Sequence, residues 1–216
     1  MCGRFQAPDP EKDPELAKII AAAKEKADHS GIAMKTAGKI FPTDTVPVLV
    51  PSEDPETPLA AIPMTWGFPG YFNAANPNAK PKPLINAKSE TAGVLRTWKE
   101  SLRSRRCVVP TAGFYEFKRA PGKKGASRAA EKYLFTARGE DVLFLAGIHK
   151  EFEKKPRPVE FFSILTMEAD GDAISEIHHR MPVIVLKSEL DEWFNGDLEK
   201  LFRREKAVAL ERSRTV

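Results

Sequence analysis

Cysteine and long apolar runs are scarce in this chain of 216 residues, and each scarcity excludes a class of protein. Two cysteines are too few for the disulfide framework of a small secreted protein. The longest apolar runs, residues 142–148 and 182–186, are too short to span a bilayer. Residues 1–20 contain no apolar segment of the kind found in a secretion signal. We therefore expect reduced thiols, no membrane segment and a cytoplasmic location.

A metal site is also not expected from the sequence. The candidate ligands Cys2, Cys107, His178 and His179 lack the close paired spacing of zinc motifs. Cys107 lies among apolar neighbours and fits a small core residue. We therefore predict no metal and no other cofactor.

The remaining composition is that of an ordinary globular protein, with 42% hydrophobic residues and a net charge of +4. The length fits one domain that is large enough to bury a substantial core. A surface of this charge permits contact with nucleic acid, but a solvated basic surface without a polyanion partner explains it equally well.

The local patterns predict helices at both ends of the chain. Asp13 and Pro14 fit the N-cap and first position of a helix that ends before Gly31. Residues 89–101 carry apolar side chains at helical spacing. Two more helices are expected, one at residues 172–177 and one opened by a capping box at residues 188–191.

Strands dominate the middle of the chain. Residues 119–131 are predicted to form a long hairpin loop, and the charged end from residue 203 is expected to fray. We predict one α+β domain over residues 1–205, a curved and barrel-like sheet flanked by helices, followed by a charged tail at 206–216. The predicted strands are residues 40–50, 59–66, 107–110, 113–118, 132–136, 142–148, 160–167 and 183–186.

Cys2 offers the most distinctive chemistry. If Met1 is removed, Cys2 carries a free α-amine next to its thiol, an arrangement that no internal cysteine has. The unperturbed pKa values, roughly 7.7–8.0 for the amine and about 8.5 for the thiol, leave both partly nucleophilic near neutral pH. The pair can condense with an aldehyde to an imine and then a thiazolidine, or the amine can act as base for the thiol. Taken alone, Cys2 favours a simpler interpretation, an inert residue at a frayed terminus.

Glu116 is a candidate acid–base group in a strand. Alternation places its side chain on the face of Phe114, opposite Tyr115 and Phe117. If that face is interior, burial raises the pKa of the carboxyl toward the range useful for general acid–base catalysis. The alternative is a glutamate on the solvated face of an edge strand.

Asn86 and His178 admit two interpretations each. Asn86 fits a hydrogen-bonding group that orients a substrate without titrating, or the N-cap of the next helix. His178 fits a proton shuttle, or a histidine at the C-terminal end of a helix.

Four segments in this order, residues 1–5, 84–91, 106–117 and 177–182, resemble the SRAP family. These are the SOS response-associated peptidases, understood as abasic-site processing proteins. The resemblance extends from Cys2 to the helix around Trp193. It implies a compact α+β fold with a barrel-like core, a positively charged groove, and capture of abasic sites in single-stranded DNA as a thiazolidine on the N-terminal cysteine.

The resemblance also assigns residues. The matching catalytic positions are Cys2, Asn86, Glu116 and His178, and the matching DNA-contacting positions are Arg4, Lys88 and Arg180, with Trp66 and Arg96 close by. We expect a monomer that associates with the nucleoid when bound to DNA, and removal of Met1 by the chain itself or by an aminopeptidase.

Two departures from the family pattern stand out. Many members carry arginine where this chain has Lys88, which cannot form a bidentate fork to phosphate. The loop after Trp66 also differs, although Phe68, Tyr71 and Phe72 offer rings for stacking on bases.

Three other functions fit parts of the pattern. A class II glutaminase-type amidohydrolase also begins Met-Cys-Gly, but such enzymes usually drive a fused synthase domain, which we do not expect here. A cysteine peptidase would use Cys2 as nucleophile and His178 as base. A non-catalytic module that binds single-stranded DNA would need only the basic surface.

Overall fold

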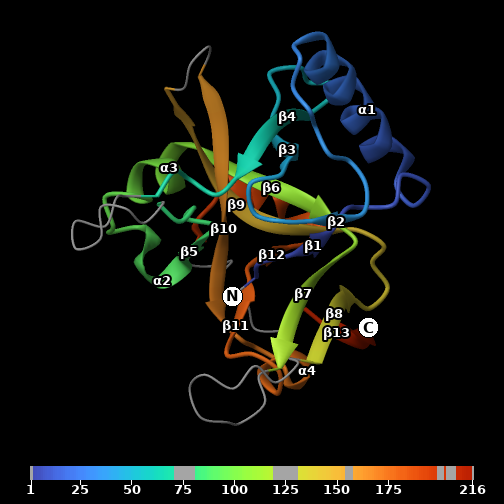
Figure 1. Cartoon of the computed structure of the whole chain (residues 1–216), viewed down its shortest axis with the longest axis vertical. Coiled ribbons are helices and arrows are strands. Elements are labelled where there is room, and N and C mark those ends of the chain that lie inside the picture. Colours follow the sequence, from blue (N-terminus) through green and yellow to red (C-terminus); the bar gives the residue numbers. More distant parts are fainter. Residues whose placement is uncertain are drawn as a thin grey trace.

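Five strands close into a barrel at the centre of the molecule, as the computed structural model shows (Figure 1). The structure describes residues 2–70, 81–118, 131–153, 158–198, 202 and 208–215. Neighbouring strands pair in the order β10–β4–β3–β6–β9, and β9 pairs back with β10 to close the ring. Only the β10–β4 pair within this ring is parallel. The barrel strands are β3 (Thr45–Pro51), β4 (Leu59–Trp66), β6 (Arg106–Thr111), β9 (Leu143–Phe152) and β10 (Val159–Glu168).

Three short strands extend the barrel and bring distant motifs to its wall. β5 (Asn86–Lys88) pairs in parallel with β10, and β11 (Arg180–Pro182) pairs antiparallel with it. β12 (Ile184–Val185) pairs with β9. Thr166 of β10 is opposite both Lys88 and Pro182. The segment that contains Asn86 (residues 84–91) and the segment that contains His178 (residues 177–182) therefore meet at the same end of β10. We call them the Asn86 and His178 motifs.

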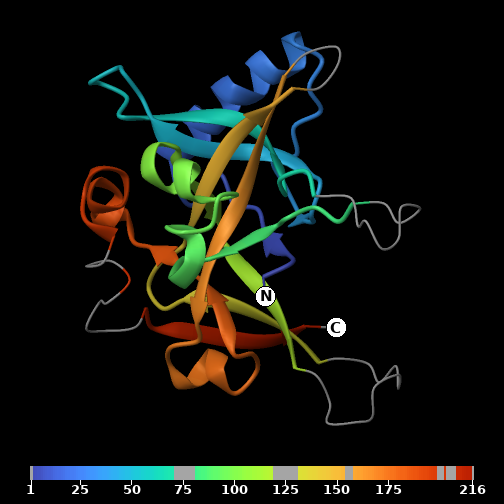
Figure 2. The ribbon, with the colours of Figure 1, turned by 90° about the vertical axis from the view of Figure 1, so that its left-hand side faces the viewer.

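A second sheet of five strands stands beside the barrel, in the order β13–β8–β7–β1–β2. The C-terminal strand β13, red in Figure 2, pairs antiparallel with β8 along its length. The expectation that the chain end frays is therefore wrong for residues 210–215, because β8 offers an open edge and Leu210 packs against the core. The strands are β1 (Phe5–Gln6), β2 (Lys39–Ile40), β7 (Gly113–Lys118), β8 (Glu131–Ala137) and β13 (Leu210–Thr215).

The first helix, α1 (Pro14–His29), forms as the sequence predicts. The carboxylate of Asp13 accepts a hydrogen bond from the backbone N–H of Leu16 at 3.0 Å, which caps the helix. The helix ends before Gly31 and covers one side of β3 and β4.

The single helix predicted over residues 89–101 is wrong. The chain instead forms α2 (Ser89–Ala92), a series of turns and α3 (Lys99–Ser104). Trp98 and Leu102 are buried, whereas Leu95 is 47% exposed, so the apolar residues do not share one helical face.

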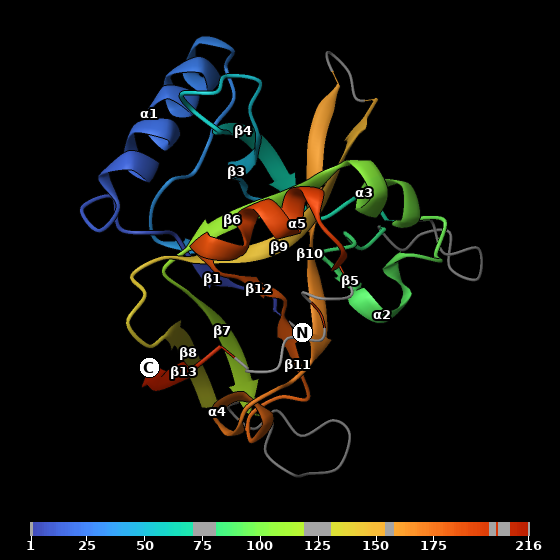
Figure 3. The same ribbon diagram turned by 180° about the vertical axis from the view of Figure 1, so that it is seen from behind.

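The later helices are short. α4 (Asp172–Ser175) follows β10, and a turn of 3-10 helix (Lys187–Glu189) leads into α5 (Leu190–Asn195), which lies over β6 in the rear view (Figure 3). The capping box predicted at Ser188 is displaced, because Glu189 accepts from the backbone N–H of Leu186 at 2.9 Å. Among the described residues, no helix combines the length and apolarity needed to cross a membrane. The loop predicted at residues 119–131 lies almost entirely outside the described residues.

Candidate active site

Cys2 lies three residues before β1, fully buried against the core. Its Sγ is 3.8 Å from the carbonyl oxygen of Arg4, to which the thiol donates. Burial, and after it the charge of the Glu116 carboxylate, raises the pKa of the thiol from 9.0 to about 12. The thiol is therefore protonated near neutral pH.

Asn86 holds the backbone of Cys2. β5 places its side chain so that Nδ2 donates to the carbonyl oxygen of Cys2 at 2.8 Å. The Oδ1 atom of Asn86 is buried and accepts no hydrogen bond from the residues that the structure describes. A buried amide oxygen without a donor is costly. Oδ1 of Asn86 therefore suits a hydrogen-bond donor such as the α-amine that Cys2 would carry after removal of Met1.

Glu116 approaches Cys2 from the second sheet. Its side chain is 2% exposed, and it shares the inner face of β7 with the buried Phe114, as the alternation predicts. The interpretation as a solvated residue on an edge strand is therefore wrong. Its charge acts on the Cys2 thiol and also on His179.

His178 lies between α4 and β11, where its ring is fixed by the next residues. Its Nδ1 is 3.0 Å from both the backbone nitrogen and the carbonyl oxygen of Arg180, and its ring stacks on His179 with centroids 4.5 Å apart. Desolvation and the neighbouring His178 lower the pKa of His179, which also feels the charge of Glu116. Of the predicted catalytic residues, Asn86 contacts Cys2 directly and Glu116 acts on its thiol through charge. His178 stacks on His179, whose pKa also responds to Glu116.

Arg180 is held by hydrogen bonds within the chain. It is 6% exposed, and its guanidinium donates to both carboxylate oxygens of Glu90, at 2.6 and 3.0 Å. Its Nη2 also donates to the carbonyl and hydroxyl oxygens of Thr166. The contact of Arg180 with DNA phosphates stays a prediction, and in this structure Glu90 and Thr166 already bind the buried side chain. Those hydrogen bonds hold the pKa of Glu90 below its usual range.

Trp66 was predicted to lie beside the DNA-contacting residues, but its ring is enclosed in the core. It is completely buried, its Nε1 donates to the carbonyl oxygen of Ile85 at 3.0 Å, and its ring stacks on Phe162. Phe68 is buried against Trp98 in the same way. Neither ring can stack on a base here, and Tyr71 and Phe72 lie outside the described residues.

A basic and aromatic surface begins two residues from Cys2. The guanidinium of Arg4 lies between the rings of Phe41 and Phe117, 4.6 and 5.4 Å from their centroids. Lys39 lies 5.8 Å from the ring centroid of Tyr115. Desolvation, followed by the charges of Lys39 and Arg4, lowers the pKa of Lys132. We call this surface the basic face, and it comprises Arg4, Lys39, Phe41, Tyr115, Phe117 and Lys132.

Strand pairing explains how the basic face forms. Lys39 is opposite Gln6, and Lys132 is opposite Phe117, so these side chains share the outer face of the second sheet. The predicted contact Arg4 belongs to this face. Lys88 and Arg96 are exposed elsewhere, before α2 and in the turn that follows it. Sequence reasoning missed Lys39 and Lys132, although the period-two pattern of β7 pointed to an outer aromatic face.

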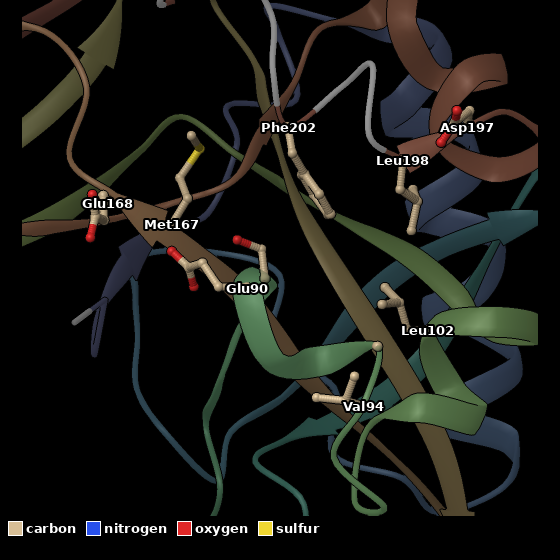
Figure 4. Close-up of a pocket in the computed structure, with 10 residues that line it drawn as sticks. Glu90, Val94, Leu102, Met167, Glu168, Asp197, Leu198 and Phe202 are labelled. Carbon is tan, nitrogen blue, oxygen red and sulfur yellow. The ribbon is translucent and has the colours of Figure 1, made fainter.

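Glu90 is a further residue that sequence reasoning missed. Its only local signal is an acidic side chain in the first turn of a helix, and its partner Arg180 is far away in the chain. Glu90 also borders a pocket of about 720 Å³ between α2, α3, the end of β10 and the segment after α5 (Figure 4). The pocket residues labelled in Figure 4 are Glu90, Val94, Leu102, Met167, Glu168, Asp197, Leu198 and Phe202.

Within the described ranges, no three histidine, cysteine or acidic side chains gather as a metal site.

Comparison with known proteins gives consistent matches. The family model described as SOS response associated peptidase (SRAP) matches residues 1–213. The chain is 27% identical over 210 residues to abasic site processing protein YedK of Escherichia coli, with 92% of this chain and 81% of YedK covered. It is 31% identical over 149 residues to abasic site processing protein HMCES of Gallus gallus, a match that covers 61% of this chain and 44% of HMCES. A crystal structure of a protein from Bacteroides thetaiotaomicron superposes with a TM-score of 0.70 at 16% identity, covering 99% of this chain and 91% of that one, so the fold is shared.

Proposed function

This chain belongs to the SOS response associated peptidase (SRAP) family, and from that premise we propose that it processes abasic sites in DNA. In this proposal, the protein captures the abasic sugar of a single strand covalently through Cys2, after Met1 has been removed. The observation that carries the proposal is the arrangement around Cys2. Asn86 holds the cysteine carbonyl, and the buried Glu116 carboxylate acts on the cysteine thiol. The names of YedK and HMCES support the same substrate.

The first bond is formed by the amine. An abasic deoxyribose is mostly a closed ring, and its opened form presents an aldehyde at C1′. The α-amine of Cys2 attacks C1′, and loss of water gives an imine. The thiol cannot compete at this stage, because a pKa of about 12 keeps it protonated near neutral pH.

The thiol completes the crosslink. Its sulfur adds to the imine carbon, its proton passes to the nitrogen, and a five-membered thiazolidine results. Because this step is intramolecular, its effective concentration is on the order of 10⁵ M for well-placed groups. A thiol kept neutral until this step is also protected from oxidation in the meantime.

The surrounding residues divide the proton transfers. The charge of Glu116 reaches the thiol, and its carboxyl is suited to opening the sugar ring and to removing water from the first adduct. The buried Oδ1 of Asn86 accepts an N–H of the new amine, which aims the nitrogen at C1′. His178 relays protons in the later steps.

The basic face supports binding of a single strand. Three cations, Arg4, Lys39 and Lys132, suit phosphates, and the rings of Phe41 and Phe117, which are not fully buried, suit base stacking. Single strands are favoured because the sugar must be reached from outside a stacked duplex.

Mass spectrometry tests the proposal directly. The purified protein is incubated with a single-stranded oligonucleotide that carries one abasic site, and with an intact oligonucleotide as control. We expect one product whose mass is the protein without Met1 plus the abasic strand minus one water. An amidohydrolase, a peptidase or a non-catalytic binding module would give no such product, so its absence refutes the proposal.

Substitutions in the basic face should weaken the salt dependence of binding. Lys39→Ala and Lys132→Ala each remove one phosphate partner, so each should flatten the slope of log K against log salt by about 0.7. The measurement is fluorescence anisotropy with an intact single strand at several salt concentrations. Lys18→Ala, on the exposed side of α1, is the control and should keep the wild-type slope. Equal slopes for all three variants would contradict the role of this face.

A further inference from the structure

Glu90 joins two motifs that are far apart in the sequence. It lies in the first turn of α2, four residues after Asn86, and it grips Arg180, two residues after His178. Its side chain is 45% exposed on the pocket side, whereas that of Arg180 is 7% exposed. Figure 4 shows the Glu90 carboxylate directed toward Met167, at the end of β10.

Arg180 is held at every part of its guanidinium except Nε. Two donors reach Glu90, and Nη2 also reaches the carbonyl and hydroxyl oxygens of Thr166. The bidentate geometry fixes the plane of the guanidinium as well as its position. Without Glu90, the buried cation would lose the carboxylate that pairs with it, and its side chain and backbone would have to rearrange.

The backbone of Arg180 in turn fixes the ring of His178. The backbone N–H of Arg180 lies 3.0 Å from Nδ1, and a donor in that position favours a lone pair on Nδ1 and therefore the Nε2–H tautomer of the neutral ring. The carbonyl oxygen of Arg180 lies at the same distance from Nδ1. When the ring becomes protonated, Nδ1–H can donate to that oxygen, so the ring changes its charge without turning.

We propose that Glu90 is a positioning residue of the Cys2 site, which holds Arg180 so that its backbone sets the tautomer and orientation of His178. The effect on crosslinking rests on the function proposed above. The tautomer is a property of the protein alone, so it can be tested whatever the protein does.

The first experiment measures the tautomer by NMR of the full chain with 15N-labelled histidine. We expect His178 of the wild type to be mainly the Nε2–H form. Glu90→Gln keeps the shape but removes the charge, and it should populate both tautomers, whereas Glu90→Asp should restore part of the wild-type ratio. Glu168→Gln is the matched control, because it removes a carboxylate from the same pocket and leaves the guanidinium partners of Arg180 in place.

The second experiment measures crosslinking with an abasic single strand. Glu90→Gln should slow the reaction about 10- to 100-fold through misplacement of His178, and more adduct should be trapped by borohydride as imine. Its affinity for an intact strand and its salt slope should stay those of the wild type. Glu168→Gln should crosslink at the wild-type rate.

The outcomes separate the two proposals. An unchanged His178 tautomer in Glu90→Gln overturns the positioning role. A slope of log K against log salt that is steeper by about 0.7 in this variant overturns it too, because Glu90 would then only keep Arg180 from binding phosphate. If wild-type protein forms no adduct, the proposed function fails, while the tautomer result still decides the role of Glu90. If Glu90→Gln does not fold, Arg180→Lys replaces it, because lysine keeps the charge but loses the fork, and the tautomer must again shift.

Discussion

A chain that cannot lose Met1 will form no heat-stable adduct with an abasic strand, although its Cys2 thiol is intact. Inserting a lysine between Met1 and Cys2 blocks removal of Met1 and leaves the cysteine nitrogen as an amide. The thiol alone cannot replace the amine, because burial and Glu116 raise its pKa to about 12. The loss of stable adduct should be complete, as judged on denaturing gels after heating.

Cys2→Ser separates the two steps of the same reaction. Its amine can still form an imine, but no thiazolidine follows, so its adduct should disappear on heating and survive only after borohydride reduction. Cys107→Ala is the control, because Cys107 is equally buried but lies on the barrel strand β6. A heat-stable adduct from the chain that retains Met1 would overturn this chemistry.

Glu116→Gln should slow crosslinking by about 10²- to 10⁴-fold, the usual range for loss of a general acid–base group. Affinity for an intact single strand should stay unchanged, because the interaction is made in the transition state and not in binding. A time course with excess protein measures the rate, and anisotropy measures the affinity. A wild-type rate in this variant would show that the carboxyl is structural.

Glu116→Gln should also change the reactivity of the Cys2 thiol, and this change shows whether attack by the thiol limits the rate. The Glu116 carboxylate raises the pKa of the Cys2 thiol, so Glu116→Gln should lower that pKa and make alkylation of the thiol faster at a given pH. If attack by the thiol limited the rate, the variant would therefore crosslink faster than the wild type. Glu160→Gln is the matched control, because Glu160 is a half-buried carboxylate whose charge acts on Cys107 in the same way.

The sequence alone was sufficient to predict a residue's environment where that environment depends on its neighbours along the chain. The cap of α1 at Asp13 follows from local spacing, and so does the inward face of Glu116, because alternation in a strand needs no information from elsewhere. The set of predicted catalytic residues followed from the family resemblance. Within that set, Asn86 donates to the backbone of Cys2, and the charge of Glu116 acts on the Cys2 thiol.

Contacts between residues far apart in the chain could not be predicted from the sequence. Nothing near Arg180 indicates that Glu90 will bury it in an ion pair, and nothing near Trp66 indicates that Phe162 and Ile85 will enclose it. Both residues were assigned to DNA contact by the family resemblance, which carries no information about these contacts within the chain.

The barrel strand β10 pairs with four other strands, β4, β5, β9 and β11, and two of these pairings are parallel and link positions far apart in the chain. Such non-local pairings form slowly and together, because each loop must close before its contacts repay the lost entropy. The Asn86 and His178 motifs both depend on β10, so a partly folded chain contains neither half of the Cys2 site. Folding and the ability to react are therefore gained in the same cooperative step, and an unfolding intermediate would carry an exposed cysteine without the residues that direct it.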